Sequence, residues 1–193
     1  MSLSIQGGAF PKSRARAPVT LVFPRLAKLL HWLTAALVLA LFCAGVVMKQ
    51  LGEGPGADAL YTFHKTAGIT LLVVVVVRLC FRLAARVAGR WPRGAGSRPV
   101  HGLLYGLLIL VPLLGWAGVS DFGARQLYIG LSLPMIWAEG AGYADLLFKG
   151  HAVLAFGLIG LVAVHIGLAV GDYIQHGNAG RTEMPHEGPP SHR

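Results

Sequence analysis

Four long apolar stretches constrain the fold of this chain more than any other feature of its sequence. They run from Leu29 to Met48, from Phe63 to Leu83, from Leu103 to Ser120 and from Ala152 to Gly171. Each is close to the ~20 apolar residues that cross the ~30 Å hydrocarbon core of a bilayer. Because lipid satisfies no backbone polar group, a segment crosses it alone only as an α-helix. The pattern therefore predicts an all-α membrane protein with four transmembrane helices.

The connections between the stretches are short, which predicts a single up-down-up-down four-helix bundle. We expect this domain to cover residues 25–176, with spans near 29–48, 63–83, 101–120 and 150–172. Residues 1–24 are rich in Gly, Ser, Pro and Arg and are expected to form a flexible lead, and residues 177–193 a disordered tail. A cleaved signal peptide is the alternative for the first stretch. Its apolar run is too long, and no small-residue cleavage site follows Met48.

The formal net charge of +9 would suit a nucleic-acid-binding protein if the basic residues formed one patch. The apolar stretches divide them instead. Five basic residues precede the first stretch, six end the second or precede the third, and two follow the fourth, whereas four lie on the opposite side with five acids. By the positive-inside rule, both termini of this multi-pass chain are expected in the cytoplasm. The basic excess then serves orientation and contact with the lipid bilayer, and no nucleic-acid partner is expected.

Histidines within the apolar stretches are functional candidates, because an ionisable group inside a membrane costs several kcal/mol unless it has a partner. His151 and His165 are 14 residues apart, which returns to nearly the same helix face about 21 Å further along the axis. His64 lies at the depth of His151, in the outer leaflet. His31 lies at the depth of His165, in the inner leaflet. The sequence therefore predicts two pairs of facing imidazoles.

Two such pairs are what two bis-histidine haems require, so we expect the axial ligand pairs His31/His165 and His64/His151. The chain contains no Cys-x-x-Cys-His motif, so the two haem b groups are expected to bind without covalent attachment. The sequence also offers small residues that would make room for a porphyrin, although glycines in membrane helices are also common packing devices. These are Gly45, Gly68, Gly157 and Gly160.

Basic residues near the histidines are candidates for the haem propionates. Arg78 follows His64 by 14 residues, which brings a cation to the level of the inner pair. Lys65 and Lys149 stand beside the outer histidines and can serve the outer propionates in the same way. A single histidine near a helix end is commonly an interfacial residue, and that interpretation is kept for His101 as an alternative to a quinone or propionate contact.

Several short motifs in this order resemble the bacterial cytochrome b561 family of small four-helix di-haem membrane proteins, over nearly the whole chain from Leu29 to Pro185. They are His31-Trp32, Phe63 to Gly68, Arg78 to Arg82, His101 to Tyr105, Leu110 to Gly115, and His151 with His165. The resemblance implies that the matching histidines ligate haem b in the pairs given above. It also implies ubiquinone as an electron partner and superoxide as a candidate donor.

The chain departs from the family pattern at the end of the fourth stretch. Many members have a further histidine there, whereas this chain has Asp172-Tyr173. If that position helps to bind or protonate a quinone, Asp172 can act as the proton carrier, or the quinone site is altered or absent. The sequence leaves these alternatives open.

The leading hypothesis is an oxidoreductase, in which an outer donor such as superoxide reduces the outer haem and a quinone accepts electrons near the inner leaflet. The outer loops argue for caution about superoxide, because four basic and five acidic residues provide no general anion steering. Only a local group of positive charges at Lys65, Lys149 or Arg125 would attract superoxide to the outer histidines. The alternative is a haem-relay subunit that binds a periplasmic redox protein and has no substrate chemistry of its own. A haem-free transporter is a third hypothesis.

Overall fold

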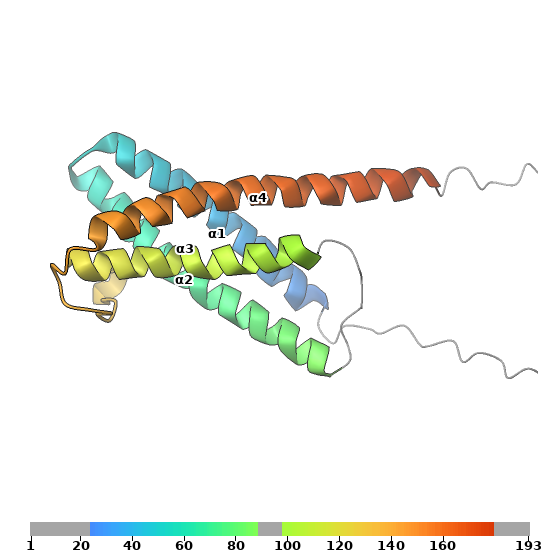
Figure 1. Ribbon diagram of the computed structural model, residues 1–193, viewed down its shortest axis with the longest axis horizontal. Helices are drawn as coiled ribbons and strands as arrows, with labels where there is room; N and C mark the ends of the chain where they lie inside the picture. The colour runs from blue at the N-terminus through green and yellow to red at the C-terminus, as the bar shows by residue number, and fades with distance from the viewer. Residues whose placement is uncertain (1–23, 89–97, 180–193) are drawn as a thin grey trace, which may run out of the picture.

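The computed structural model describes residues 24–88 and 98–179, which form four long α-helices and one short 3-10 helix (Figure 1). Their bounds are Pro24–Leu51 for α1, Pro55–Val87 for α2, Arg98–Phe122 for α3, Tyr128–Gly130 for η1 and Ala144–Ala179 for α4. The four α-helices are each long and apolar enough to cross a membrane. Successive α-helices run in opposite directions, so that α1 begins and α4 ends at the same end of the bundle (Figure 1). The predicted all-α four-helix bundle is confirmed.

We call the end where α1 begins and α4 ends the inner end, and the opposite end, which carries the connections α1–α2 and α3–α4, the outer end. Each helix extends beyond the apolar stretch that predicted it. For example, α2 begins at Pro55 rather than near residue 63. Two glycines with positive φ, Gly52 at 71° and Gly54 at 125°, turn the chain sharply out of α1, and Pro55 is well suited to a first helical turn.

The fourth helix continues to Ala179, three residues into the segment predicted to be a disordered tail. Hydropathy detects the part of a helix that contacts lipid, whereas the hydrogen-bonded backbone continues into the polar region on either side. Residues 1–23 of the predicted lead and 180–193 of the predicted tail lie outside the described residues.

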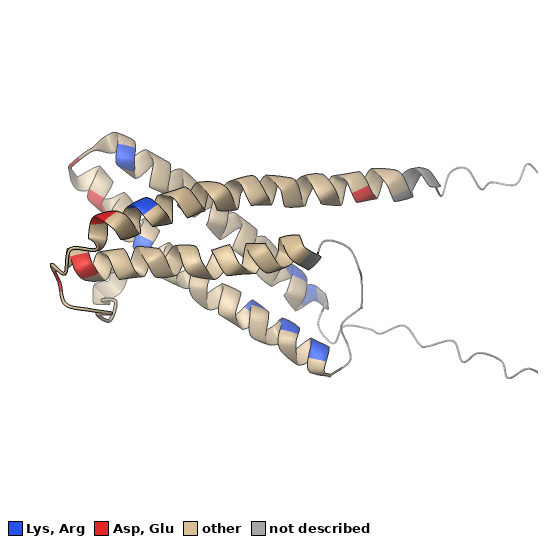
Figure 2. Cartoon of the chain, in the orientation of Figure 1, with Lys and Arg blue, Asp and Glu red and all other residues tan. Residues whose placement is uncertain are grey.

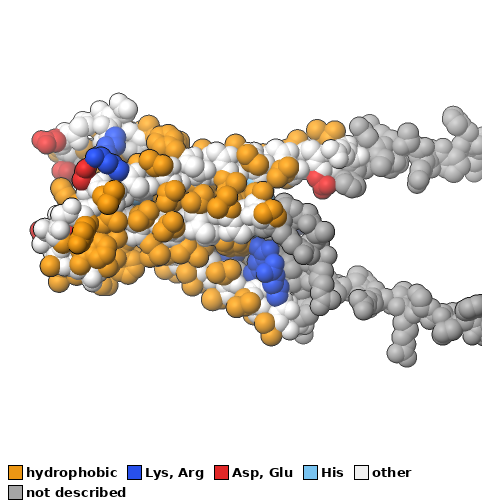
Figure 3. Space-filling model, in the orientation of Figure 1, with side chains coloured by type: hydrophobic (Ala, Val, Ile, Leu, Met, Phe, Trp, Pro, Cys, Tyr) orange, Lys and Arg blue, Asp and Glu red, His pale blue; other side chains and the backbone are white. Residues whose placement is uncertain are grey.

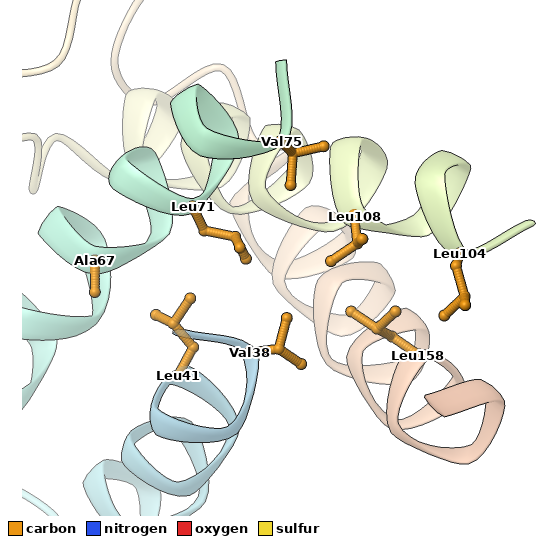
Figure 4. Packing of buried hydrophobic residues seen from close by; sticks show 8 residues of the cluster. All are labelled: Val38, Leu41, Ala67, Leu71, Val75, Leu104, Leu108 and Leu158. Carbon is orange, nitrogen blue, oxygen red and sulfur yellow. The ribbon is translucent and has the colours of Figure 1, made fainter. Parts of the chain in front are cut away.

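The helices pack as two hairpins, α1 with α2 and α3 with α4, which are joined mainly through contacts between α2 and α3. A small apolar core drawn from all four helices lies between them (Figure 4). Its buried residues are Val38, Leu41, Ala67, Leu71, Val75, Leu104, Leu108 and Leu158. Many other large apolar side chains are exposed, as one face of the molecule shows (Figure 3). In the most apolar part of α4, only 6% of the residues are buried. Such a surface suits lipid, in which apolar side chains need no burial.

Asp121, near the end of α3, fixes the start of α4. Its buried carboxylate accepts hydrogen bonds from the backbone N–H groups of Gly142, at 3.2 Å, and of Ala144, at 2.5 Å. A carboxylate at a helix N-terminus satisfies otherwise unpaired N–H groups and interacts favourably with the helix dipole. Asp121 therefore closes the α3–α4 hairpin two turns before His151.

Replacing Asp121 by Ala should lower the free energy of unfolding by about 1–3 kcal/mol, because two backbone N–H groups lose their acceptor. Thermal unfolding in detergent would measure the loss. The matched control is Asp145→Ala, which removes an exposed ion pair with Lys149 (2.7 Å) and should change stability little. Equal losses in the two variants would contradict the capping role of Asp121.

Candidate functional site

The outer pair of histidines lies between α2 and α4. The ring centroids of His64 and His151 are 5.9 Å apart, and the two rings are inclined by 73°. The apolar cavity beside them is lined by residues of all four helices, including Phe42 of α1, Gly68 of α2 and Val111 of α3. Two imidazoles thus face each other in an otherwise apolar part of the bundle.

One nitrogen of His151 is held by the backbone. Its Nδ1 lies 2.8 Å from the carbonyl oxygen of Val111, and since a carbonyl only accepts, Nδ1 must donate. In a neutral imidazole this leaves the lone pair on Nε2, which is the tautomer that a metal-binding histidine needs. The Nδ1 atom of His64 is buried and has no hydrogen-bond partner of acceptable geometry. The outer pair therefore has ring nitrogens that are not used by the protein.

Glycines leave space beside both outer imidazoles. A Cβ atom at Gly45 would lie 3.3 Å from Cε1 of His64, and one at Gly115 would lie 3.1 Å from Nδ1 of His151. These approaches are closer than ordinary van der Waals contact. Of the four glycines that the sequence offers as room for a porphyrin, Gly45 lies against an outer imidazole, whereas an added Cβ at Gly68, Gly157 or Gly160 would meet no atom within 4 Å.

The inner pair lies between α1 and α4, close to the inner end. The ring centroids of His31 and His165 are 6.4 Å apart. A guanidinium N–H of Arg78 donates to Nδ1 of His31 at 2.9 Å, and the ring of His101 lies 5.0 Å from that of His165. The inner imidazoles thus have polar side chains from α2 and α3 as neighbours, whereas the polar contact of His151 is with a backbone carbonyl.

Both pairs have the spacing that a single metal ion requires. Two imidazoles that bind one ion from opposite sides at about 2.0–2.1 Å have ring centroids about 6.3 Å apart. Within residues 24–88 and 98–179, no cluster of three or more His, Cys, Asp or Glu residues is arranged to hold a metal ion. A haem brings four nitrogen ligands of its own and needs only two axial side chains. The donor set, the glycines and the apolar cavity fit a haem.

Comparison with known proteins agrees with this geometry. A family model described as prokaryotic cytochrome b561 matches residues 22–174. The chain belongs to this family. Members of the cytochrome b561 family bind haem b and transfer electrons across a membrane, and the four apolar helices make this chain a multi-pass membrane protein.

Two curated relatives are similar over most of their length. Cytochrome b561 homolog 2 of Escherichia coli (strain K12) is 26% identical over 142 residues, which are 70% of this chain and 76% of the relative. Cytochrome b562 of Cereibacter sphaeroides is 32% identical over 126 residues, which are 60% of this chain and 80% of the relative.

The other residues predicted to contact a haem propionate or a quinone lie in different parts of this cytochrome b561 family member. Arg78 and His101 lie beside the inner pair, as described above. Lys65 donates to the carbonyl oxygen of Ala124 at 2.8 Å and so fastens the outer loop, and Lys149 pairs with Asp145 on the surface. Asp172 lies exposed on α4, two turns after His165. Both outer lysines thus have partners within the protein.

Three features of the site are not predicted by the sequence analysis. Gly115 lies within a family-like motif, yet its contact with His151 depends on how α3 crosses α4. The acceptor role of the Val111 carbonyl has no sequence signal, because every residue has a carbonyl. The third feature is Tyr105. The Cζ atoms of Arg78 and Arg82 lie over its ring, 5.5 and 5.3 Å from the ring centroid. Tyr105 belongs to the His101 to Tyr105 motif of the sequence analysis, which assigns it no role.

Replacing Gly115 by Ala should weaken haem binding at the outer pair by roughly 5- to 150-fold, because the added methyl group crowds His151 at a cost of about 1–3 kcal/mol. Haem content and the absorption spectrum of the purified protein would measure the change. Gly106→Ala is the matched control on the same helix, where an added Cβ meets no atom within 4 Å. An unaltered haem content in Gly115→Ala would count against the outer site described here.

Proposed function

We propose that this chain carries electrons across the membrane through two haem b groups, from a donor at the outer end to a membrane quinone, with ubiquinone as the candidate, near the inner end. His64 and His151 are the proposed axial ligands of one haem, and His31 and His165 those of the other. Haem b supplies reversible one-electron chemistry when it is bound. The observation that carries the proposal is the presence of two facing imidazole pairs at two depths of a membrane bundle.

The protein's own residues prepare these positions. The Val111 carbonyl orients His151, and Gly45 and Gly115 leave the sides of the outer imidazoles open. At the inner level Arg78 is the proposed partner of a haem propionate, since a guanidinium forms strong paired hydrogen bonds with a carboxylate. His101, in ring contact with His165, is a candidate quinone or propionate contact, and exposed Asp172 is a candidate proton carrier for a quinone.

We further propose that the inner end faces the cytoplasm and that the membrane is the bacterial inner membrane. Basic residues of α1 and α2 gather at this end, whereas most acidic residues of the described part of the chain lie at the outer end (Figure 2). The basic group comprises Arg25, Lys28, Arg78, Arg82 and Arg86. Such a bias toward one side supports a cytoplasmic position for both termini.

The donor at the outer end is either superoxide or a periplasmic redox protein. Two observations favour the second, in which the chain is a haem-relay subunit. Lys65 donates to the Ala124 carbonyl, Arg125 donates to the Leu133 carbonyl and Lys149 pairs with Asp145, so each cation that could attract a small anion already has a partner in the protein. The outer loop also presents apolar side chains, with Ile129 95% and Leu131 62% exposed.

Haem content of single variants tests the ligand assignment. Each of His31→Ala, His64→Ala, His151→Ala and His165→Ala should reduce the haem content from two per chain to about one, or leave one haem with a changed spectrum, because a ligand to iron is lost. His101→Ala should keep both haems. Haem quantification with electron paramagnetic resonance spectra would measure this. Two unaltered low-spin haems in any of the four variants would remove that histidine from the proposal.

A reconstituted system separates the two donors. Protein in quinone-containing liposomes should pass electrons inward, at a rate that His64→Ala reduces at least tenfold. If superoxide alone supports quinone reduction, the chain is a superoxide:quinone oxidoreductase. If electrons flow only when a co-purifying protein is added, the relay role holds. Electron transfer that is unchanged by His64→Ala would contradict both.

A further inference from the structure

The hydrogen bond between Arg78 and His31 has a consequence for iron binding at the inner pair. Arginine only donates, so Nδ1 of His31 must accept, at 2.9 Å. In a neutral imidazole one nitrogen has the lone pair and the other has the proton. With its lone pair directed at Arg78, His31 has none left for a metal. His31 held in this way cannot be an axial ligand.

The outer pair shows the opposite arrangement. Nδ1 of His151 donates to the Val111 carbonyl at 2.8 Å, which leaves the lone pair of this imidazole on the nitrogen that the protein does not use. The backbone thus prepares His151 for a metal, whereas a side chain occupies the corresponding lone pair of His31. The two proposed haem sites therefore differ in what must happen before iron binds.

Arg78 also belongs to a pocket at the inner end that suits a carboxylate. The pocket is lined by Ala27, Arg78, Phe81, Arg82, His101 and Tyr105. Arg78 and Arg82 are one turn apart on α2, where like charges repel, and both guanidinium groups lie over the ring of Tyr105. A cluster of blue side chains marks this end of the molecule in Figure 3. A carboxylate is strongly attracted to such a pair of guanidinium groups.

We propose that Arg78 couples binding of a haem carboxylate to binding of iron by His31. Arg78 holds His31 until a carboxylate of the incoming haem pairs with its guanidinium group, and His31 is then free to bind iron. The hydrogen bond between Arg78 and His31 is exchanged for an ion pair between Arg78 and the carboxylate. The freed imidazole would displace a solvent molecule from the incoming iron, and its proton stays on the nitrogen that does not bind the metal. Tyr105 and Arg82 act as positioning residues that keep Arg78 within reach of the carboxylate. The inference rests on the proposed role of His31 as a ligand.

Haem with esterified propionates tests this coupling. The full-length chain, prepared without haem, is titrated with haem b and with its dimethyl ester, and low-spin haem per chain is counted by absorption and electron paramagnetic resonance. The unaltered chain should bind two equivalents of haem b but only one of the ester tightly. In Arg78→Met, which frees His31, the ester should bind the inner site about tenfold to a hundredfold more tightly, as expected for removal of a charge-assisted hydrogen bond.

The gain in ester binding is the decisive observation. If Arg78 only paired with a propionate, the Arg78→Met substitution would weaken binding of haem b and leave ester binding unchanged, which would overturn the coupling. Arg86→Met is the control, because Arg86 is an exposed cation on the same helix, two turns from Arg78. This variant should bind haem b and the ester in the same ratio as the unaltered chain. Repeating the titration in His64→Ala assigns the effect to the inner site.

Failure of the underlying ligand assignment would look different. If the His31→Ala variant binds two low-spin equivalents of haem b, His31 is not a ligand and both proposals fall. If His31→Ala loses one equivalent but Arg78→Met does not strengthen ester binding, the ligand assignment stands and only the coupling is overturned.

Discussion

The pairing of imidazoles within a hydrocarbon setting is the constraint on which the rest of this structure depends. A polar ring inside a membrane needs a partner, and α4 carries two such rings about four turns apart, at His151 and His165. Each meets a histidine from the α1–α2 hairpin, at 5.9 and 6.4 Å between ring centroids. The two hairpins therefore have to face each other across the histidines, and the shared apolar core can remain small because lipid, rather than water, surrounds the bundle.

The sequence predicts this arrangement to the level of helices and histidine pairs, because both follow from periodicity. Length and hydropathy give the four spans, and the 14-residue spacing of His151 and His165 gives two depths on one face. Predictions that depend on tertiary contacts were less complete. Lys65 is a predicted propionate contact from its place beside His64, and the structure adds its hydrogen bond to the carbonyl of Ala124, 59 residues further along the chain. Asp121 was counted only as an outer acid, but it is the buried cap of α4. No local pattern reports such long-range partners.

The two imidazole pairs lie in different electrostatic surroundings. The outer pair has apolar neighbours, a backbone carbonyl and two glycines, whereas Arg78, Arg82, Tyr105 and His101 gather around the inner pair. Positive charge near a haem favours its reduced form, and burial among apolar groups also changes its potential. A more cationic inner site agrees with the proposed flow of electrons from the outer end to the inner end. Under the proposed coupling, the same cations make binding at the inner site depend on the haem carboxylates.

The central claim is that two haems occupy two depths of one four-helix chain. Pulsed electron paramagnetic resonance on the oxidised protein tests it most directly, because the dipolar coupling between two low-spin irons reports their separation. The 14 residues between His151 and His165 place the ligands about 21 Å apart along α4 at 1.5 Å per residue, so we expect an iron–iron distance of about 20 Å. A single iron with no dipolar partner within the chain, or two irons at about half that distance, would contradict the account.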